Sequence, residues 1–248
     1  MTRIASFSAP ANIVVCGASG GIGNAFVRAL AEDERAGQVF ALSRTPPDFD
    51  SPHVVSLAVD IMDEASVAAI AGQCAEAGRL DLVIVATGML HDGVRLRPEK
   101  RMQDLDAGAM AEVFRINTIA PAILAKHFLP LLRRDAKSAF AAISARVGSI
   151  GDNRLGGWAS YRASKAALNM LIKTLSIEHA RSNPESIVAA LHPGTTDTAL
   201  SQPFQGNVPE GKLFTPDFTA ESLLQVLDGL TGDDTGGFFA WNGDPIEY

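Results

Sequence analysis

Cysteine, positive charge and long apolar runs are all scarce in this sequence. Among 248 residues the cysteines are Cys16, at the end of an apolar run, and Cys74, in an Ala-rich segment. We therefore expect two free thiols in a reducing cytosol rather than a disulfide or a metal site. The chain contains 21 Lys and Arg against 28 Asp and Glu, which gives a net charge of -7. Without a broad positive field, the protein is a poor partner for nucleic acid.

Apolar runs of membrane-spanning length are missing. Residues 1–10 contain one Arg and no apolar stretch of signal-peptide length, and the longest apolar stretches elsewhere have the length of core strands. These absences predict a cytoplasmic protein without a membrane segment. Because 47% of the residues are hydrophobic and no repeat or low-complexity tract is present, we expect one large core.

Segments typical of strands alternate with segments typical of helices along the chain. Strands are predicted at 12–15, 38–43, 54–59, 80–86, 139–144, 187–191 and 238–241. Helices are predicted at 24–31, 64–77 and 160–179, and residues 107–132 predict two helical segments broken near Pro121. The alternation predicts a single Rossmann-type α/β domain over residues 1–248, with a doubly wound parallel sheet of about seven strands.

One long irregular stretch, residues 195–216, is expected to be a substrate loop, because long loops in compact domains commonly form lids or binding loops. Its apolar side chains suggest a pocket wall, and they are Phe204, Val208, Leu213 and Phe214.

Glycines cluster between the first predicted strand and its helix. Gly17, Gly21 and Gly23 have the spacing G-x-x-x-G-x-G, which allows a tight turn and lets a pyrophosphate approach backbone N–H groups at the start of the helix. Glycine-rich turns also serve close packing alone, so the motif favours a dinucleotide without requiring one.

Tyr161 and Lys165 are four residues apart in a predicted helix, so their side chains emerge on one face. A free phenol has a pKa of about 10 and needs a nearby cation to exchange protons near neutral pH. Lys165 can be that cation. Taken alone, the pair is more typical of a packed Tyr beside a surface Lys whose stem covers apolar atoms, and the context of the other motifs reverses this.

The two motifs occur in one chain in a familiar order, and the sequence resembles the short-chain dehydrogenase/reductase family over nearly its whole length, in particular NADP-type carbonyl reductases. Residues 16–23 resemble the family's T-G-x-x-x-G-I-G turn, with Cys16 in the place of Thr. Tyr161 to Lys165 matches the Y-x-x-x-K motif. Residues 85–88 resemble the N-N-A-G segment, although both Asn are absent.

The resemblance extends to further residues. Residues 60–61 resemble the pair that receives the adenine ring, Asn117 resembles the Asn that holds a proton-relay water, and residues 193–198 resemble the segment that holds the nicotinamide carboxamide and a phosphate. The implied cofactor-binding residues are Gly17, Ser19, Gly21, Ile22, Gly23, Arg44, Asp60, Ile61, Ala86, Thr87, Gly88, Tyr161, Lys165, Pro193, Gly194, Thr196 and Thr198.

Several of these residues also have a purely structural interpretation. Asp60 is placed to cap the helix that starts near Asp63, Asn117 can be a hydrogen-bonded core amide, and Thr198 can be a loop hydroxyl without a ligand. All of these motifs occur along the chain in the order typical of the family, which favours a cofactor-binding site over separate structural roles.

The sequence departs from the family where a substrate-orienting Ser is usual. Alignment on Gly148 places Ala145 there. Ser144 is one residue away and, by strand alternation, is predicted to face away from the site. Ser149 lies in the following loop at a spacing to Tyr161 close to the family's usual one. We expect one of these two serines to donate to the substrate oxygen, and the spacing slightly favours Ser149.

Cofactor preference depends on the end of the second predicted strand. An acidic residue there would bind the ribose hydroxyls of NAD, whereas an Arg would pair with the 2′-phosphate of NADP. The sequence has Arg44 and no acidic residue at this place, which favours NADP(H) over NAD, although a solvated surface Arg is the alternative.

The resemblance implies an NADP(H)-dependent oxidoreductase that transfers hydride between nicotinamide and a small carbonyl or alcohol substrate. Tyr161 would act as acid and base, and Lys165 would lower its pKa and hold the nicotinamide ribose. Reduction is the direction expected with NADPH. The family also implies a homodimer or homotetramer through the long central helices. Ala145 leaves open a catalytically weak NADP(H)-binding sensor or partner protein on the same fold.

Overall fold

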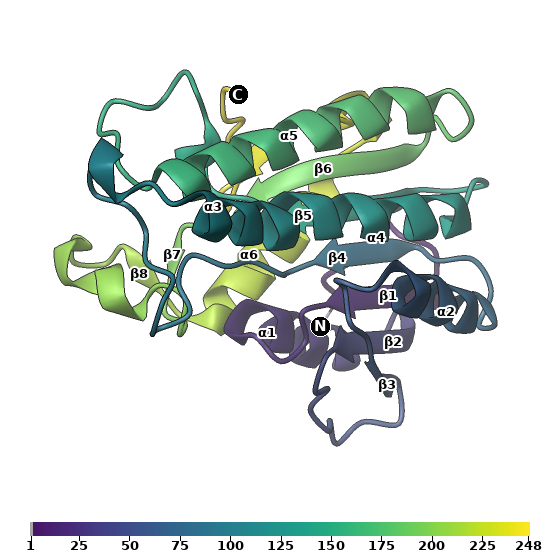
Figure 1. Ribbon diagram of the computed structural model, residues 1–248. Coiled ribbons are helices and arrows are strands. Elements are labelled where there is room, and N and C mark those ends of the chain that lie inside the picture. The colour runs from purple at the N-terminus through teal and green to yellow at the C-terminus, as the bar shows by residue number, and fades with distance from the viewer. Residues whose placement is uncertain (1) are drawn as a thin grey trace.

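Seven parallel strands form one sheet at the centre of the computed structural model, which describes residues 2–248 (Figure 1). They are β1 (Ala11–Cys16), β2 (Ala36–Ser43), β3 (Val54–Ala58), β4 (Leu82–Val85), β5 (Ser138–Ile143), β6 (Ser186–His192) and β9 (Phe238–Ala240). Their order is β3-β2-β1-β4-β5-β6-β9, and all neighbouring pairs are parallel. This topology confirms the predicted Rossmann-type fold in a single domain, with small shifts at the strand ends.

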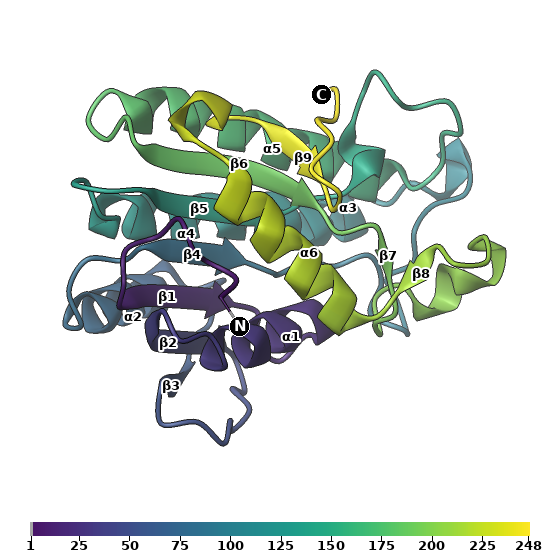
Figure 2. The same ribbon diagram turned by 180° about the vertical axis from the view of Figure 1, so that it is seen from behind.

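Helices cover both faces of the sheet. They are α1 (Gly21–Ala31), α2 (Glu64–Ala75), α3 (Ala107–Phe114), α4 (Ala120–Phe128), α5 (Ala159–Ala180) and α6 (Pro216–Gly229). Figure 1 shows α2, α3, α4 and α5 in front of the sheet, and Figure 2 shows α1 and α6 on the opposite face. Successive strand residues point to opposite faces, so Ile13 and Val15 of β1 belong to one core and Val14 and Cys16 to the other.

The strand order reverses at β1, which lies between β2 and β4. From β1 the chain adds β2 and β3 on one side, then returns to add β4, β5, β6 and β9 on the other. The crossovers therefore leave a crevice at the carboxyl ends of β1 and β4, the place where open α/β sheets bind ligands.

The predicted break near Pro121 is wrong. The chain continues from α3 through a π-helical turn (Arg115–Ile119) into α4, where Pro121 lies in the first turn. Pro121 has no N–H to donate, and the wider turn before it keeps the chain helical without that hydrogen bond. This turn contains Asn117, one of the predicted site residues.

The predicted substrate loop is more regular than expected. Thr195–Thr196 (β7) pairs in parallel with Leu213–Phe214 (β8), and a 3₁₀ turn covers Gln202–Asn207. The loop is therefore closed at its base by a small two-stranded sheet of its own.

The two cysteines are free and buried, as expected from their apolar surroundings. Within residues 2–248, every helix is too short or too polar to cross a membrane.

Candidate active site

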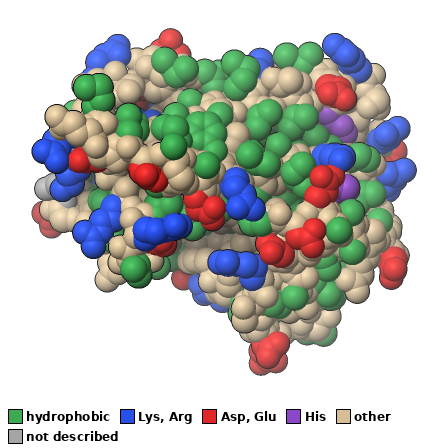
Figure 3. All heavy atoms as spheres, viewed as in Figure 1, with side chains coloured by type: hydrophobic (Ala, Val, Ile, Leu, Met, Phe, Trp, Pro, Cys, Tyr) green, Lys and Arg blue, Asp and Glu red, His purple; other side chains and the backbone are tan. Residues whose placement is uncertain are grey.

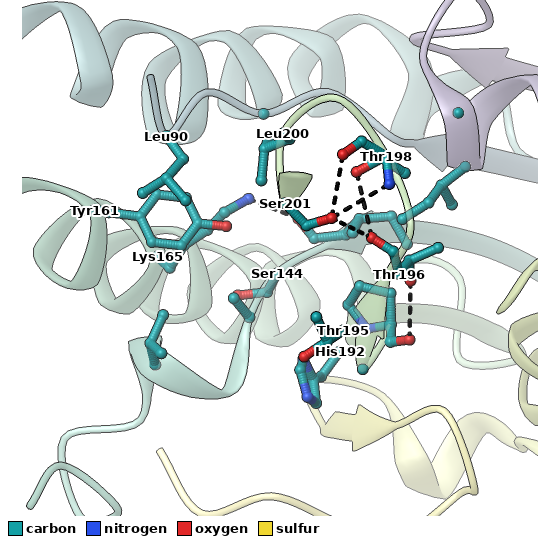
Figure 4. Close-up of a pocket in the computed structure, with 18 of the residues that line it drawn as sticks. Leu90, Ser144, Tyr161, Lys165, His192, Thr195, Thr196, Thr198, Leu200 and Ser201 are labelled. Atoms are coloured by element: carbon teal, nitrogen blue, oxygen red, sulfur yellow. Dashed lines mark hydrogen bonds between the residues drawn. The ribbon is translucent and has the colours of Figure 1, made fainter. Parts of the chain in front are cut away.

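A cavity of about 450 Å³ lies at the carboxyl ends of the central strands (Figure 4). It brings together the turn before α1, the residues that follow β4, β5 and β6, and the first turns of α5. The sequence-predicted residues that line it are Gly21, Ile22, Ala86, Thr87, Gly88, Ser144, Tyr161, Lys165, Pro193, Gly194, Thr196 and Thr198. The structure thus places both predicted motifs around one space.

Residues 17–23 and 86–88 are called the glycine wall below. Gly20, Gly21, Ile22 and residues 86–88 line one side of the cavity, and the rest of the turn lies behind them. Gly17 has a φ of 93°, and a Cβ at this residue would lie 2.8 Å from the carbonyl oxygen of Ala86. A Cβ on Gly23 would lie 2.1 Å from the carbonyl oxygen of Gly17. Both positions therefore exclude any side chain, which explains the spacing of the motif.

The glycine wall presents hydrogen-bond donors to the cavity. The first turn of α1 has no side-chain cap and no acidic residue, and its N–H groups have no partner within the helix. Gly21 and Ile22, which carry two of these N–H groups, line the cavity. Beside them, the hydroxyl oxygen of Thr87 is buried and has no hydrogen-bond partner among the described residues. These groups fit the pyrophosphate and polar atoms of a dinucleotide.

Tyr161 and Lys165 project from α5 into the cavity, as predicted from their spacing. Figure 4 shows their polar ends turned toward the same side, with Leu90 over the Tyr161 ring. The ammonium nitrogen of Lys165 lies 5.9 Å from the centre of that ring and donates to the carbonyl oxygen of Ile143 at 2.8 Å. Tyr161 is 9% exposed and Lys165 only 2%.

Burial sets the protonation of this pair. It raises the pKa of Tyr161 to about 12 and lowers the pKa of Lys165 to about 8. At neutral pH the phenol therefore holds its proton and the lysine is charged. Burial is the only cause of the shift at Tyr161, so the lowering of its pKa expected from Lys165 is not found in the protein alone. Protonated Tyr161 is a proton donor.

Asn117 is fully buried beside the cavity, not on its lining. Its side-chain oxygen accepts from the N–H of Met89 at 2.7 Å, and its amide nitrogen donates to the carbonyl oxygen of Met89 at 2.8 Å and to Ser164 Oγ at 3.1 Å. The side chain thus joins the segment after β4 to α5, and it positions Gly88 next to Lys165. Any role with a relay water stays a prediction.

The two candidate serines lie in different surroundings. Ser144 lines the cavity beside Ala145, and its Oγ donates to Asn169 Oδ1 at 2.7 Å. The amide nitrogen of Asn169 is buried and has no partner in the described part of the chain. Ser149 is also buried, but it lies off the cavity lining, and its Oγ accepts from the N–H of Asp152 at 3.1 Å. The geometry therefore favours Ser144, whereas spacing favoured Ser149.

Six predicted cofactor-binding residues lie off the cavity lining. Two of them, Gly17 and Gly23, are in the glycine turn, and the other four follow β1, β2 and β3. Arg44 is exposed directly after β2, Ser19 is exposed in the glycine turn, and Asp60 and Ile61 follow β3. Asp60 accepts from the N–H of Met62 at 2.9 Å, so it shapes its own turn. All four lie after strands on the β3 side of the switch point, where a dinucleotide that starts at the cavity would extend.

Residues 193–201 fold over the cavity through their own hydrogen bonds (Figure 4). Ser201 Oγ donates to the carbonyl oxygen of Thr196 at 2.5 Å and accepts from the N–H of Thr198 at 3.2 Å. Thr196 Oγ1 pairs with Thr219 Oγ1 at 2.8 Å, whereas Thr198 Oγ1 has only a 3.5 Å contact to the Thr196 carbonyl. Thr198 therefore keeps a hydroxyl that is nearly free.

Another part of the cavity lining, formed by Trp158, Phe204 and Val208 and called the aromatic wall below, was only partly predicted. Phe204 and Val208 line it as expected, but Leu213 and Phe214 do not. Trp158 was missed: its ring packs edge-on against Phe204 with centres 4.9 Å apart and against Tyr161 at 6.4 Å. Its position three residues before Tyr161 was the available signal.

His192 is a second residue that the sequence analysis missed. It lines the cavity from the end of β6, and its Nδ1 accepts from the N–H of Arg146 at 3.3 Å. Burial, with a smaller contribution from Arg146, lowers the pKa of His192 to about 4, so the ring is neutral at pH 7. An accepting Nδ1 leaves the proton of the neutral ring on Nε2. Its place directly before Pro193 in the matched motif was the signal.

Glu99 holds the segment between β4 and α3 against the start of α5. Its carboxylate accepts from both the N–H and the hydroxyl of Ser160, and its carbonyl oxygen accepts from the N–H of Trp158 at 2.6 Å. Trp158 has a φ of 52°, an unusual conformation for a bulky residue, directly before α5. The Glu99 contacts hold the Trp158 backbone in place one turn before Tyr161.

Comparison with known proteins gives one consistent family. The family model described as short chain dehydrogenase matches residues 11–208. The 1-hydroxy-2-glutathionyl-2-methyl-3-butene dehydrogenase of Rhodococcus sp. (strain AD45) is 32% identical over 95% of this chain and 99% of its own length. The cis-4-hydroxycyclohexanecarboxylate dehydrogenase of Sinomonas cyclohexanicum is 28% identical over 93% and 94% of the two chains.

A solved structure agrees with these relatives. The NADPH-bound carbonyl reductase from chicken fatty liver superimposes with a TM-score of 0.83 at 30% identity, and the match covers 97% of this chain and all of that one. With the glycine wall and the Tyr161–Lys165 pair on one cavity, the matches identify this chain as an oxidoreductase of the short-chain dehydrogenase/reductase family.

Proposed function

We propose that this protein is an NADP(H)-dependent carbonyl reductase in which Tyr161 is the acid/base. The observation that carries the proposal is the meeting of Tyr161, Lys165 and Ser144 on one cavity, together with a glycine wall that a dinucleotide fits. A nicotinamide held there supplies or accepts the hydride. The residues of this chain then bind, orient and exchange the proton.

Tyr161 donates its proton to the carbonyl oxygen as that oxygen gains negative charge. The high pKa of the buried phenol keeps the proton in place until then, which suits reduction. Lys165 stays charged below about pH 8 and stabilises the phenolate that forms. We further propose that Lys165 holds the nicotinamide ribose and that Asn117 supports a water through which the phenolate regains its proton.

Ser144 replaces the serine that Ala145 removes. In the present orientation of the Asn169 amide, the Ser144 hydroxyl donates its proton to Asn169 Oδ1. The amide nitrogen then has no partner among the described residues. The opposite orientation of the amide lets that nitrogen donate to Ser144 Oγ, which frees the hydroxyl proton for the substrate oxygen. This exchange satisfies a buried donor and supplies a second hydrogen bond to the reacting carbonyl.

NADP(H) is the preferred cofactor because Arg44 is exposed directly after β2. No acidic side chain is present there to bind the ribose hydroxyls of NAD. Arg44→Ala is expected to weaken NADPH binding by about 1.5–3 kcal/mol, the range of a hydrogen bond to a charged group, and to leave NADH binding nearly unchanged. Fluorescence titration of both cofactors measures this, with Arg134→Ala, an exposed arginine far from the cavity, as control. Equal losses for the two cofactors would contradict the 2′-phosphate contact.

Turnover separates this function from a sensor that binds NADPH without reacting, the alternative that Ala145 leaves open. Consumption of NADPH with a panel of aldehydes, ketones and quinones is the expected result. Binding of NADPH without consumption across the panel would favour the sensor.

Exposed apolar side chains and the free thiols bear on assembly and compartment. Three exposed apolar side chains lie on α5 and on the π-helical turn before α4: Ile119, Met170 and Ile177. A homodimer or homotetramer through these helices would cover them. The two free thiols suit the reducing cytoplasm.

A further inference from the structure

A second hollow of about 1020 Å³, called the side groove here, adjoins the catalytic cavity. It lies between the segment that leads from β4 to α3 and the substrate loop, and Phe204 lines both spaces. Phe204 packs edge-on between His91, at 5.8 Å, and Trp158, at 4.9 Å. Phe204 therefore lies at the boundary between the catalytic cavity and the side groove.

Three cations line the side groove: Arg95, Arg97 and Lys100. All three are exposed, and none forms an ion pair with any residue in the described range 2–248. Figure 3 shows Lys and Arg side chains gathered on the side of the molecule where this segment lies. Apart from the attraction between Arg95 and the nearby carboxylate of Asp92, their charges are available to a ligand.

The acidic side chains of the side groove are already engaged. Asp104 and Glu112 each form an ion pair with the arginine three residues away along the chain. Asp106 caps α3, and the carboxylate of Glu99 is bound to Ser160. The groove thus contains cations without partners beside carboxylates with partners, although the overall charge of the chain is negative.

The backbone that carries the cations is held at two points. Asp92 Oδ1 accepts from the N–H groups of Val94, Arg95 and Leu96 at 2.7–2.9 Å, and these hydrogen bonds lower the pKa of Asp92. Glu99 fixes the other end against α5. Because the turn is ordered before any ligand arrives, little backbone entropy is lost when the arginines bind.

We infer that the side groove binds a carboxylate at the far end of the substrate, on a chain that passes Phe204 from the catalytic cavity. The planar guanidinium groups of Arg95 and Arg97 match the two oxygens of a carboxylate. This inference rests on the proposed carbonyl reductase function, and it narrows the substrates to oxo acids whose carbonyl and carboxylate are separated by a spacer.

The test compares levulinate and its longer homologues, which are methyl ketones with a terminal carboxylate, with their methyl esters. For the homologues that reach the side groove, kcat/KM should favour the acid over its ester by about tenfold, since each exposed ion pair contributes up to about 1 kcal/mol. The difference should appear in KM, because the contact is made equally in the ground and transition states. Calorimetric titration of acid and ester into the complex with oxidised NADP⁺, which has no hydride to give to a carbonyl, measures the same preference without turnover.

The double variant Arg95→Gln/Arg97→Gln should lower the preference to about unity. Arg134→Gln/Arg181→Gln removes the same charge from exposed positions outside both hollows and should retain it. Equal binding of acid and ester by the wild type, or a preference that survives in the first variant, overturns the inference. Absence of NADPH consumption with every acid and ester counts against the proposed function, and calorimetry then decides the side groove by itself.

Discussion

The two walls of the catalytic cavity are built in different ways. The glycine wall is made of backbone: Gly17 and Gly23 are required because a Cβ at either would strike a carbonyl oxygen. The aromatic wall is made of side chains such as Trp158 and Phe204, which come from segments far apart in the sequence and touch only in the folded protein. At Gly17 and Gly23 the first wall has no room for a side chain, whereas each side chain of the second can change separately.

The comparison predicts that chemistry can be abolished without disturbing the glycine wall. Tyr161→Phe removes the proton donor and keeps the ring against Trp158. We expect turnover to fall by about 10²–10⁴-fold, the usual contribution of general acid catalysis, with NADPH affinity unchanged. Steady-state rates and cofactor titration measure the two effects.

Tyr248→Phe is the matched control, because Tyr248 is the other tyrosine of the sequence and donates to the carbonyl oxygen of Gly236 outside the cavity. It should keep normal turnover. Wild-type turnover in Tyr161→Phe would remove this residue from the mechanism.

A smaller effect is expected at the serine that borders the substrate. Ser144→Ala should lower kcat/KM. The lost transition-state stabilisation should be about 2–4 kcal/mol, the range for one donor to a developing oxyanion. Ser149→Ala should have little effect, since Ser149 is buried off the cavity lining and bonds to Asp152. If Ser149→Ala alone lowers the rate, spacing was the better guide than the cavity geometry.

The smallest expected effect tests the glycine wall itself. Gly23→Ala places a Cβ against the backbone and should destabilise the fold by about 1–3 kcal/mol, as overpacking does, while weakening NADPH binding. Gly72→Ala, in α2 with open space around it, should stabilise by about 0.5–1 kcal/mol. Urea unfolding compares the variants. Equal stability of the two would show that the turn yields to a side chain.

Sequence reasoning succeeded where local rules apply. Buried parallel strands are continuous apolar runs, and the glycine spacing reports a steric requirement between neighbours, so the parallel seven-stranded sheet and the glycine turn were predictable. Helical periodicity alone predicts that Tyr161 and Lys165 lie on the same face of a helix.

Ser144 and Ser149 show where such rules stop. Strand alternation no longer applies after β5 ends at Ile143, because a 3₁₀ turn over Arg146–Gly148 follows. A Cβ on Gly148 would lie 2.8 Å from the backbone of Lys165, so this turn packs directly on α5. That tertiary contact determines which serine reaches the cavity, and the spacing of residues along the chain does not encode it.

The aromatic wall and the side groove were beyond local rules for the same reason. Trp158 and Phe204 belong to separate loops, and Glu99 reaches Ser160 across 61 positions of sequence. The prediction of a break near Pro121 was wrong because a π-helical turn before it keeps the chain helical without the N–H that proline lacks.

The buried Glu99 contact has a consequence for transplanting substrate preference between relatives. A grafted β4–α3 segment brings its own cations, yet it docks only if its carboxylate finds a hydroxyl and an N–H at the start of the recipient's α5. Glu99 and Ser160 therefore have to be transferred together. A chimera that exchanges one without the other leaves a buried carboxylate or hydroxyl without its hydrogen-bond partner. Successful grafts should carry both.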